Sequence, residues 1–145
     1  MALDAKIGMT FFPWEERYAV HVPIIDSQHQ RIFKEINTLV RLLDNKPSLG
    51  AIEAIVDDMI DHVENHLRTE EQYLAKHPDF ASHKDKHLVF SERIKEFDRQ
   101  LFATKPEAMA LSLFLFLGAW LQNHILTEDQ LYFDYLRNNS LLPPP

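Results

Sequence analysis

The sequence predicts an all-α protein, an antiparallel up-down four-helix bundle with an irregular N-terminal arm and a short C-terminal helix. Glycine is scarce, with 3 in 145 residues, and β-branched residues do not alternate with polar ones as they would in strands. Apolar residues instead recur at spacings of three and four along segments that proline-containing breaks separate. Helices of roughly 20 residues joined by short connections form such a bundle most economically.

The irregular arm should cover about residues 1–22. Pro13 and Pro23 bracket two aromatic residues, Trp14 and Tyr18. Proline fixes its own backbone and lacks a donor, so this segment should not form a regular helix. The two aromatic rings could anchor the arm against the body of the bundle.

The prolines and the capping residues place the helices. Asp26 or Ser27 can cap the first helix, and a proline in the first turn can start the fourth. The predicted helices cover about residues 26–44, 49–74, 79–102 and 104–125, with a short fifth piece to residue 136. We therefore expect a single domain over residues 1–145, with the bundle at about 23–126 and a C-terminal piece at about 127–145.

Composition excludes several classes of function. The formal net charge of -7 disfavours nucleic acid and anionic membrane surfaces as partners. There is no cysteine, which excludes disulfides, thiolate nucleophiles and Fe–S ligation.

The longest apolar run, Met109–Leu121, is interrupted by Ser112. It is shorter than the about 20 residues that span a bilayer, so no membrane insertion is expected. The start of the chain carries no secretion signal, so a cytoplasmic protein is expected, with no protein partner indicated.

Seven polar residues fall where the core of a bundle should be apolar: His29, His66, Glu70, His83, His87, His124 and Asp129. In an antiparallel hairpin, residues equally distant from the turn lie at the same height. Three pairs of histidines are centred on the breaks at Pro47, Pro78 and Pro106 in turn: His29 with His66, His66 with His87, and His87 with His124. Glu70 and His83 are also centred at Pro78, one turn below. The sequence therefore predicts a layer of four histidines inside the bundle, one from each helix, with Glu70 and His83 in the next turn.

Metal ions explain this layer better than a polar core does. His66 and Glu70 are four residues apart, as are His83 and His87, so each pair projects from one helix face. A single pair of this kind is more often a solvated surface pair, and a bundle without metal would need the coincident midpoints to be accidental. Burying imidazoles and carboxylates is costly unless cations satisfy them.

The number of ligands then suggests two metals, because seven are too many for one tetrahedral zinc ion. Two octahedral metals could share both carboxylates and an oxide or hydroxide. The metal with three histidines would then be full, whereas the metal with two would keep one open position. A reversibly bound gas requires such an open position.

The chain resembles the hemerythrin family, specifically the bacterial hemerythrin domains. The similarity runs from about Trp14 to Leu136, and it rests on the motifs Asp26-Ser-Gln-His29, His66-Leu-Arg-Thr-Glu70-Glu71, His83-Lys-Asp-Lys-His87 and Trp120-Leu-Gln-Asn-His124-Ile-Leu-Thr-Glu-Asp129. The resemblance implies that His83, His87 and His124 hold a six-coordinate iron, and that His29 and His66 hold a five-coordinate iron. It also implies that Glu70, Asp129 and an oxide or hydroxide bridge the irons, with no haem.

The resemblance further implies reversible binding of dioxygen at the open iron, for storage, delivery, scavenging or sensing. An apolar gas pocket would be lined by Ile32, Leu67, Trp120, Leu121 and Ile125, all of which the bundle core also needs. His62 is a further candidate, either as a partly exposed histidine at the rim or as a group that hydrogen-bonds the bound gas.

Other neighbours of the ligands are less clearly assigned. Glu71 and Glu128 adjoin ligands but point about 100° away on a helix, so solvated roles are expected for both. Asp26, three residues before His29, could cap the helix or orient a ligand imidazole.

An alternative function is a diiron enzyme or iron-handling protein that consumes peroxide or nitric oxide. No Glu-x-x-His occurs in the chain, which argues against a ferritin-like oxygenase. We therefore expect a binding protein rather than an enzyme, with weak peroxidase or NO-reducing activity left open.

Overall fold

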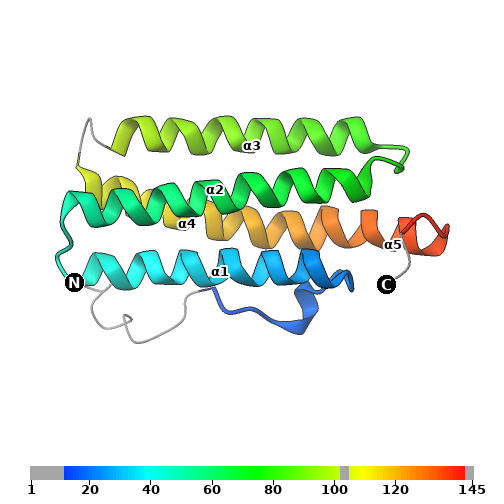
Figure 1. Ribbon diagram of the computed structural model, residues 1–145, viewed down its shortest axis with the longest axis horizontal. Helices are drawn as coiled ribbons and strands as arrows, with labels where there is room; N and C mark the ends of the chain where they lie inside the picture. The colour runs from blue at the N-terminus through cyan, green and yellow to red at the C-terminus, as the bar shows by residue number, and fades with distance from the viewer. Residues whose placement is uncertain (1–11, 102–104, 143–145) are drawn as a thin grey trace.

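The computed structural model describes residues 12–101 and 105–142, with only the backbone for 98–101, and it confirms the all-α bundle (Figure 1). The long helices are α1 (Pro23–Asp44), α2 (Leu49–Leu74), α3 (Phe80–Leu101) and α4 (Pro106–His124). They lie side by side and alternate in direction along the chain. No strand occurs within the described ranges.

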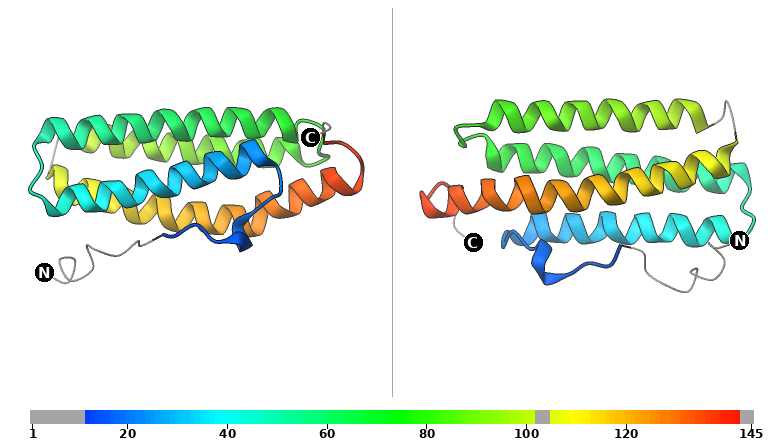
Figure 2. Two further views of the ribbon diagram at one scale, coloured as in Figure 1. Left: turned by 60° about the horizontal axis from the view of Figure 1, so that its bottom comes forward. Right: turned by 180° about the vertical axis from the view of Figure 1, so that it is seen from behind.

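The last helix is longer than expected. α4 continues through a π-helical segment, η3 (Ile125–Asp129), into α5 (Gln130–Asn138), so the predicted fifth piece is an extension and not a separate packing unit (Figure 2). By length and composition, the run Pro106–Asn138 could cross a membrane. In this bundle it is a core helix that carries His124 and Asp129 into the interior.

The helix starts follow local chemistry. Ser48 caps α2, because its side chain accepts a hydrogen bond from the Ala51 amide at 3.1 Å. Pro106 lies in the first turn of α4, as predicted. The predicted end of α3 near Phe102 lies outside the described residues.

The first helix begins three residues earlier than predicted, at Pro23, which suits a first turn. Asp26 therefore does not cap it. Its carboxylate instead accepts hydrogen bonds from the backbone amides of Val20 at 2.8 Å and His21 at 3.1 Å. Asp26 thus fastens the end of the arm to α1, a role that differs from both of those expected.

Aromatic residues anchor the arm, as expected. Tyr18 is buried and stacks on Phe33 with ring centroids 5.2 Å apart, and Trp14 packs edge-on against the same ring at 6.0 Å. The side chain of Asn37 also holds the backbone of Phe12, donating to its carbonyl and accepting from its amide.

Two apolar clusters lie on either side of the polar layer. The larger cluster includes Ile32 on α1 and Leu67 on α2. The smaller cluster includes Ile25 on α1 and Leu74 on α2, together with Phe133 of α5. Along α1 and α2, the polar residues therefore sit between apolar layers that exclude water from both sides.

Candidate metal centre

All seven polar residues that the sequence singled out come together in the structure. Each is at most 5% exposed, although each carries nitrogen or oxygen atoms that prefer water. Every long helix contributes at least one of them: His29 from α1, His66 and Glu70 from α2, His83 and His87 from α3, and His124 from α4, with Asp129 from η3.

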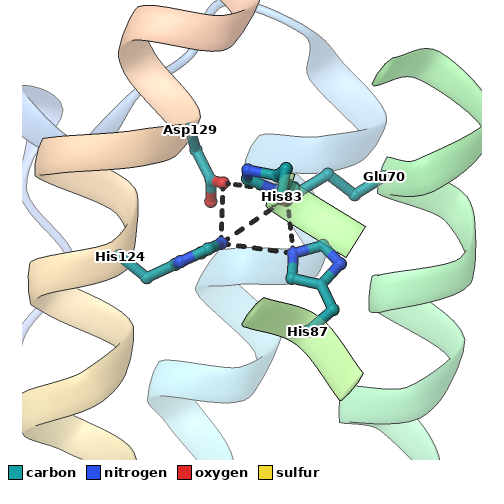
Figure 3. Close-up of side chains that lie close together, drawn as sticks. All are labelled: Glu70, His83, His87, His124 and Asp129. Carbon is teal, nitrogen blue, oxygen red and sulfur yellow. Dashed lines mark hydrogen bonds and ion pairs between the residues drawn. The ribbon is translucent and has the colours of Figure 1, made fainter. Parts of the chain in front are cut away.

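Glu70 joins three histidines through one of its oxygen atoms. Its Oε1 lies 2.9 Å from Nε2 of His83, 3.2 Å from Nε2 of His87 and 3.9 Å from Nε2 of His124. Figure 3 shows these three rings converging from α3 and α4. We call His83, His87 and His124 the three-histidine group.

The other oxygen of Glu70 faces the remaining pair of histidines. Its Oε2 lies 3.0 Å from Nε2 of His66 and 3.5 Å from Nε2 of His29. We call His29 and His66 the two-histidine group. One carboxylate therefore reaches both groups, with one oxygen for each.

Asp129 repeats this arrangement from the opposite helix. Its Oδ1 lies 3.1 Å from Nε2 of His124 and 3.4 Å from Nε2 of His83, whereas its Oδ2 lies 3.5 Å from Nε2 of His29. In a regular α-helix, residues five apart point about 140° away from one another. The π-helical turn removes this offset, since it pairs residues five apart. The π segment thus lets His124 and Asp129 face the same cluster.

Burial and mutual interaction shift the pKa values in this cluster. Burial alone would raise the pKa of Glu70, but the close approach of the imidazoles of His124, His29, His66 and His83 lowers it well below its ordinary value. Burial and the charge of Glu70 raise the pKa of Asp129. Burial would lower the pKa of His124, but the charge of Asp129 raises it to about 10. Burial, followed by the proximity of His66, lowers the pKa of His29.

Several atoms of the cluster lack the partners that buried polar groups need. Within the described residues, both nitrogens of His29, Oε2 of Glu70 and both oxygens of Asp129 make no hydrogen bond. Each such atom would cost about 1–3 kcal/mol. Cations among these atoms would satisfy them, and imidazole with carboxylate is a ligand set that transition metals accept. The residues present therefore fit a metal centre.

The potential ligand atoms fall into two sets, each with its atoms within 4.8 Å of one another. One set consists of Glu70, His83, His87, His124 and Asp129, and the other of His29, His66 and Glu70. Because Glu70 belongs to both, the arrangement suits two neighbouring metal ions with a shared carboxylate.

Three further side chains hold the outward-facing Nδ1 atoms of these histidines. Gln28 Oε1 lies 2.9 Å from Nδ1 of His66. Glu71 Oε2 lies 3.4 Å from Nδ1 of His87, and Glu128 Oε2 lies 3.6 Å from Nδ1 of His83. Such contacts fix the orientation of a ligand imidazole and leave Nε2 free for a metal.

The expectation of a solvated role was therefore wrong for Glu71, whereas Glu128 pairs with the exposed Lys86 and approaches His83 without a hydrogen bond. Both carboxylates do point away from the cluster, but an imidazole has a second nitrogen on its outer side that can meet them. The midpoint argument could have placed one of these carboxylates near its histidine, since the midpoint of His83 and Glu128 also falls at Pro106. The same reasoning would have found Gln28, because its midpoint with His66 falls at Pro47.

A small apolar cavity adjoins the two-histidine group. It offers about 10 Å³ to the centre of a water-sized molecule, which is room for roughly one small molecule. Its walls are Ile32, Val63, His66, Leu67, Phe90, Leu117, Trp120 and Leu121. Of the predicted pocket residues, Ile125 is buried in the same apolar cluster but does not line the cavity. Val63, Phe90 and Leu117 were not predicted as lining residues.

His62 lies away from this cavity. Its Nδ1 forms an ion-pair contact with Glu35 of α1, and its side chain is 29% exposed. It lines an outer groove together with Trp14 and Arg31. The structure therefore places His62 at the surface between α1 and α2, which corresponds to the rim position and not to the gas-facing one.

Comparisons with known proteins agree with this arrangement. A sequence model of the Hemerythrin HHE cation binding domain matches residues 20–136. The chain is 30% identical over 131 residues to the bacteriohemerythrin of Stenotrophomonas maltophilia (strain R551-3), covering 89% of this chain and 84% of that protein. It is 25% identical over 128 residues to the bacteriohemerythrin of Clostridium acetobutylicum, covering 85% and 99%. A hemerythrin-like protein of Naegleria gruberi is 29% identical over 123 residues, covering 83% and 90%. The matched span of the sequence model contains every residue of the polar cluster.

Proposed function

The chain belongs to the hemerythrin family, and we propose that its buried cluster holds two iron ions and binds dioxygen reversibly. The observation that carries this proposal is the division of Glu70, whose two oxygens face two different groups of histidines. A single metal would not need a carboxylate directed both ways. Storage, delivery, scavenging and sensing are all consistent with such a site.

The ligand set accounts for one full and one open metal position. His83, His87 and His124 would hold one iron, His29 and His66 the other, and Glu70 and Asp129 would bridge them with an oxide or hydroxide. The first iron would have six ligands and the second five. When bound, the two irons supply the two electrons that dioxygen takes.

The protein's own side chains favour a gas at the two-histidine group. The cavity beside His66 is enclosed by apolar residues and has room for little more than one small molecule. Water gains few hydrogen bonds there, so the cavity favours a small apolar ligand over bulk solvent. The outer contacts from Gln28 and the two glutamates hold the imidazoles in place while the gas exchanges.

The lining also favours binding over turnover. Among the described residues, His66 is the one titratable residue that lines the cavity, and its Nε2 is directed at Glu70. The described part of the cavity wall therefore offers no other acid or base to move protons to a bound molecule. A diiron enzyme that consumes peroxide or nitric oxide is the alternative, and this lining gives it little support.

A single oxygen cycle tests the proposal. Purified protein is loaded with iron and reduced without air; dioxygen is then admitted and removed while visible absorption and iron per chain are recorded. We expect two irons per chain and an absorption band that appears with dioxygen and disappears on its removal. Irreversible oxidation would favour the enzyme or iron-handling alternative, and one metal or none per chain would overturn the two-iron assignment.

A further inference from the structure

Trp120 connects a ligand of the three-histidine group to the protein surface. Its ring stacks on the imidazole of His124, with centroids 4.3 Å apart and planes 14° apart. On the same indole, Phe90 stacks with centroids 3.5 Å apart and planes 3° apart. Trp120 is only half-buried, whereas Phe90 and His124 are buried. The stack therefore has one partly exposed ring in direct contact with a proposed iron ligand.

That exposed part of Trp120 lies in a groove between α3 and α4. The groove has a volume of about 730 Å³, and its walls include Val89, Phe116 and Glu92 as well as Trp120 and His124. A molecule seated in it would meet the indole ring one side chain away from the metal centre. The two-histidine group has no such arrangement. Within the described residues, the rings of His29 and His66 contact each other and no other aromatic ring.

The rim of the groove carries an excess of negative charge. Lys86 is paired with Glu128, and Arg93 lies 3.3 Å from Glu96. Asp85 and Glu92 also line the groove, and neither forms an ion pair with another described residue. Together with the formal charge of -7, this pattern favours a positively charged molecule at the groove.

We propose that a positively charged one-electron donor docks in the groove between α3 and α4 and delivers electrons through Trp120 and His124 to the iron centre. This inference rests on the proposed function and names the partner that would restore the centre after oxidation. Two donor molecules each give up one electron, the two ferric ions each take one, and a bridging oxide takes one proton to become hydroxide. Electron tunnelling weakens steeply with distance, so ring contact with a ligand makes this the short route.

A second aromatic contact provides the matched control. The ring of Tyr132 lies against His83, a ligand of the same group, with centroids 4.5 Å apart and planes 42° apart. Its other neighbour is His77, which stacks on it at 4.1 Å. Tyr132 is thus less parallel to its ligand, and it is not among the residues that line the groove. Trp120→Leu and Tyr132→Leu each remove one ring from one ligand, but only the first should interrupt the route.

The first measurement is the rate at which the diferric, iron-loaded protein is reduced by the methyl viologen radical cation in stopped flow. We expect Trp120→Leu to slow this reduction severalfold and Tyr132→Leu to leave it near the wild-type rate. Asp85→Asn with Glu92→Gln should slow the cationic donor but not the anionic donor dithionite. The wild-type rate with the cation should fall by about tenfold or more in high salt. Equal rates in wild type and Trp120→Leu would overturn the route, and an unchanged cationic rate in the double variant would overturn the docking site.

The second measurement needs no metal. In the metal-free protein, flash-quench oxidation with ruthenium(III) tris-bipyridyl removes one electron from an accessible indole, which loses its N–H proton to water. Trp14 is also partly exposed, so Trp120 is tested in its absence: the neutral tryptophanyl radical should appear in Trp14→Phe and should disappear when Trp120→Leu is added to that variant. A radical that already disappears in Trp14→Phe would contradict the accessibility of Trp120 that the route requires.

The oxygen cycle separates this inference from the proposed function. If the wild type lacks two irons or a reversible absorption band, the proposed function fails. If the wild type shows both, but the substitutions at Trp120 and at the acidic rim leave the reduction rate unchanged, only the electron route fails. Should Trp120→Leu not fold, the charge variants Asp85→Asn and Glu92→Gln carry the test alone.

Discussion

The three-histidine group and the two-histidine group share Glu70 and Asp129 but have very different surroundings. Two members of the three-histidine group have a carboxylate near Nδ1: Glu71 is within hydrogen-bond distance of His87 at 3.4 Å, and Glu128 forms a longer ion-pair contact with His83 at 3.6 Å. Aromatic rings also pack against this group, Trp120 against His124 and Tyr132 against His83.

The two-histidine group has weaker outer support and more free space. His66 meets a neutral amide, Gln28, and Nδ1 of His29 makes no hydrogen bond within the described residues. The apolar cavity touches His66 and none of the other four histidines. The difference teaches that one carboxylate-bridged layer can combine a firmly held side with an open side, and that the gas should bind at the open one.

The largest effect should come from the residue that both sides share. Glu70→Gln keeps the size of the side chain but removes the negative charge and one of the two acceptor oxygens. We expect the iron content to fall from two per chain to below one, as measured by metal analysis after gel filtration. Glu53→Gln, an exposed change on the same helix, is the control. Two irons retained in Glu70→Gln would show that the carboxylate does not hold the two sides together.

A smaller effect should come from outer support on one side only. Glu71→Gln weakens the contact at Nδ1 of His87, and loss of such a contact typically costs about 10–100-fold in metal affinity. We expect the affinity for one of the two irons to fall within this range in a competition assay with a chelator. Asp57→Asn, exposed on α2, serves as the control and should bind as the wild type does. If Glu71→Gln also matches the wild type, the carboxylate support of the three-histidine group is dispensable.

The open side can be altered without touching a ligand. Val63→Ile adds a methylene group beside a cavity of only about 10 Å³. We expect dioxygen affinity to fall severalfold with both irons retained, while overpacking costs about 1–3 kcal/mol of stability. Val56→Ile makes the same change on α2 away from the cavity, so it should lose similar stability and keep its dioxygen affinity. Equal dioxygen affinities in the two variants would place the gas elsewhere.

The smallest effect is expected at His62, which belongs to neither side. His62→Leu removes the contact with Glu35, and a partly exposed pair of this kind contributes about 1 kcal/mol or less. We expect the autoxidation rate of the oxygenated protein to be unchanged, because the side chain lies away from the cavity. Faster autoxidation would mean that His62 acts on the bound gas after all.

The sequence predicted the heights of six of the seven residues because two facts set a residue's height in a bundle: where the chain turns back, and how far the residue lies from that turn. The midpoints at Pro47, Pro78 and Pro106 therefore brought four histidines into one layer, with Glu70 and His83 one turn below, without any structure. The helix bounds followed equally well where a proline or a serine cap marked them, as at Ser48.

The parts that were missed depend on details that spacing does not contain. A π-helical turn at Ile125–Asp129 changes which residues share a helix face. Residue spacing alone therefore did not show that Asp129 faces the same cluster as His124. Helical angle alone also says nothing of the second nitrogen of an imidazole, which is why Glu71 was misjudged. Ile125 was expected in the gas pocket, but it does not line the cavity, although it is buried in the same apolar cluster. Closeness to a ligand along a helix does not say on which side the cavity opens.

The most direct test of the central claim is a crystal structure of the iron-loaded protein with azide, recorded with anomalous scattering at the iron edge. The account predicts two iron peaks, one beside His83, His87 and His124 and one beside His29 and His66, with Glu70 and Asp129 between them. It also predicts that azide binds the iron of the two-histidine group and points into the cavity next to Leu67. A single iron peak, or azide bound on the three-histidine side, would contradict the account.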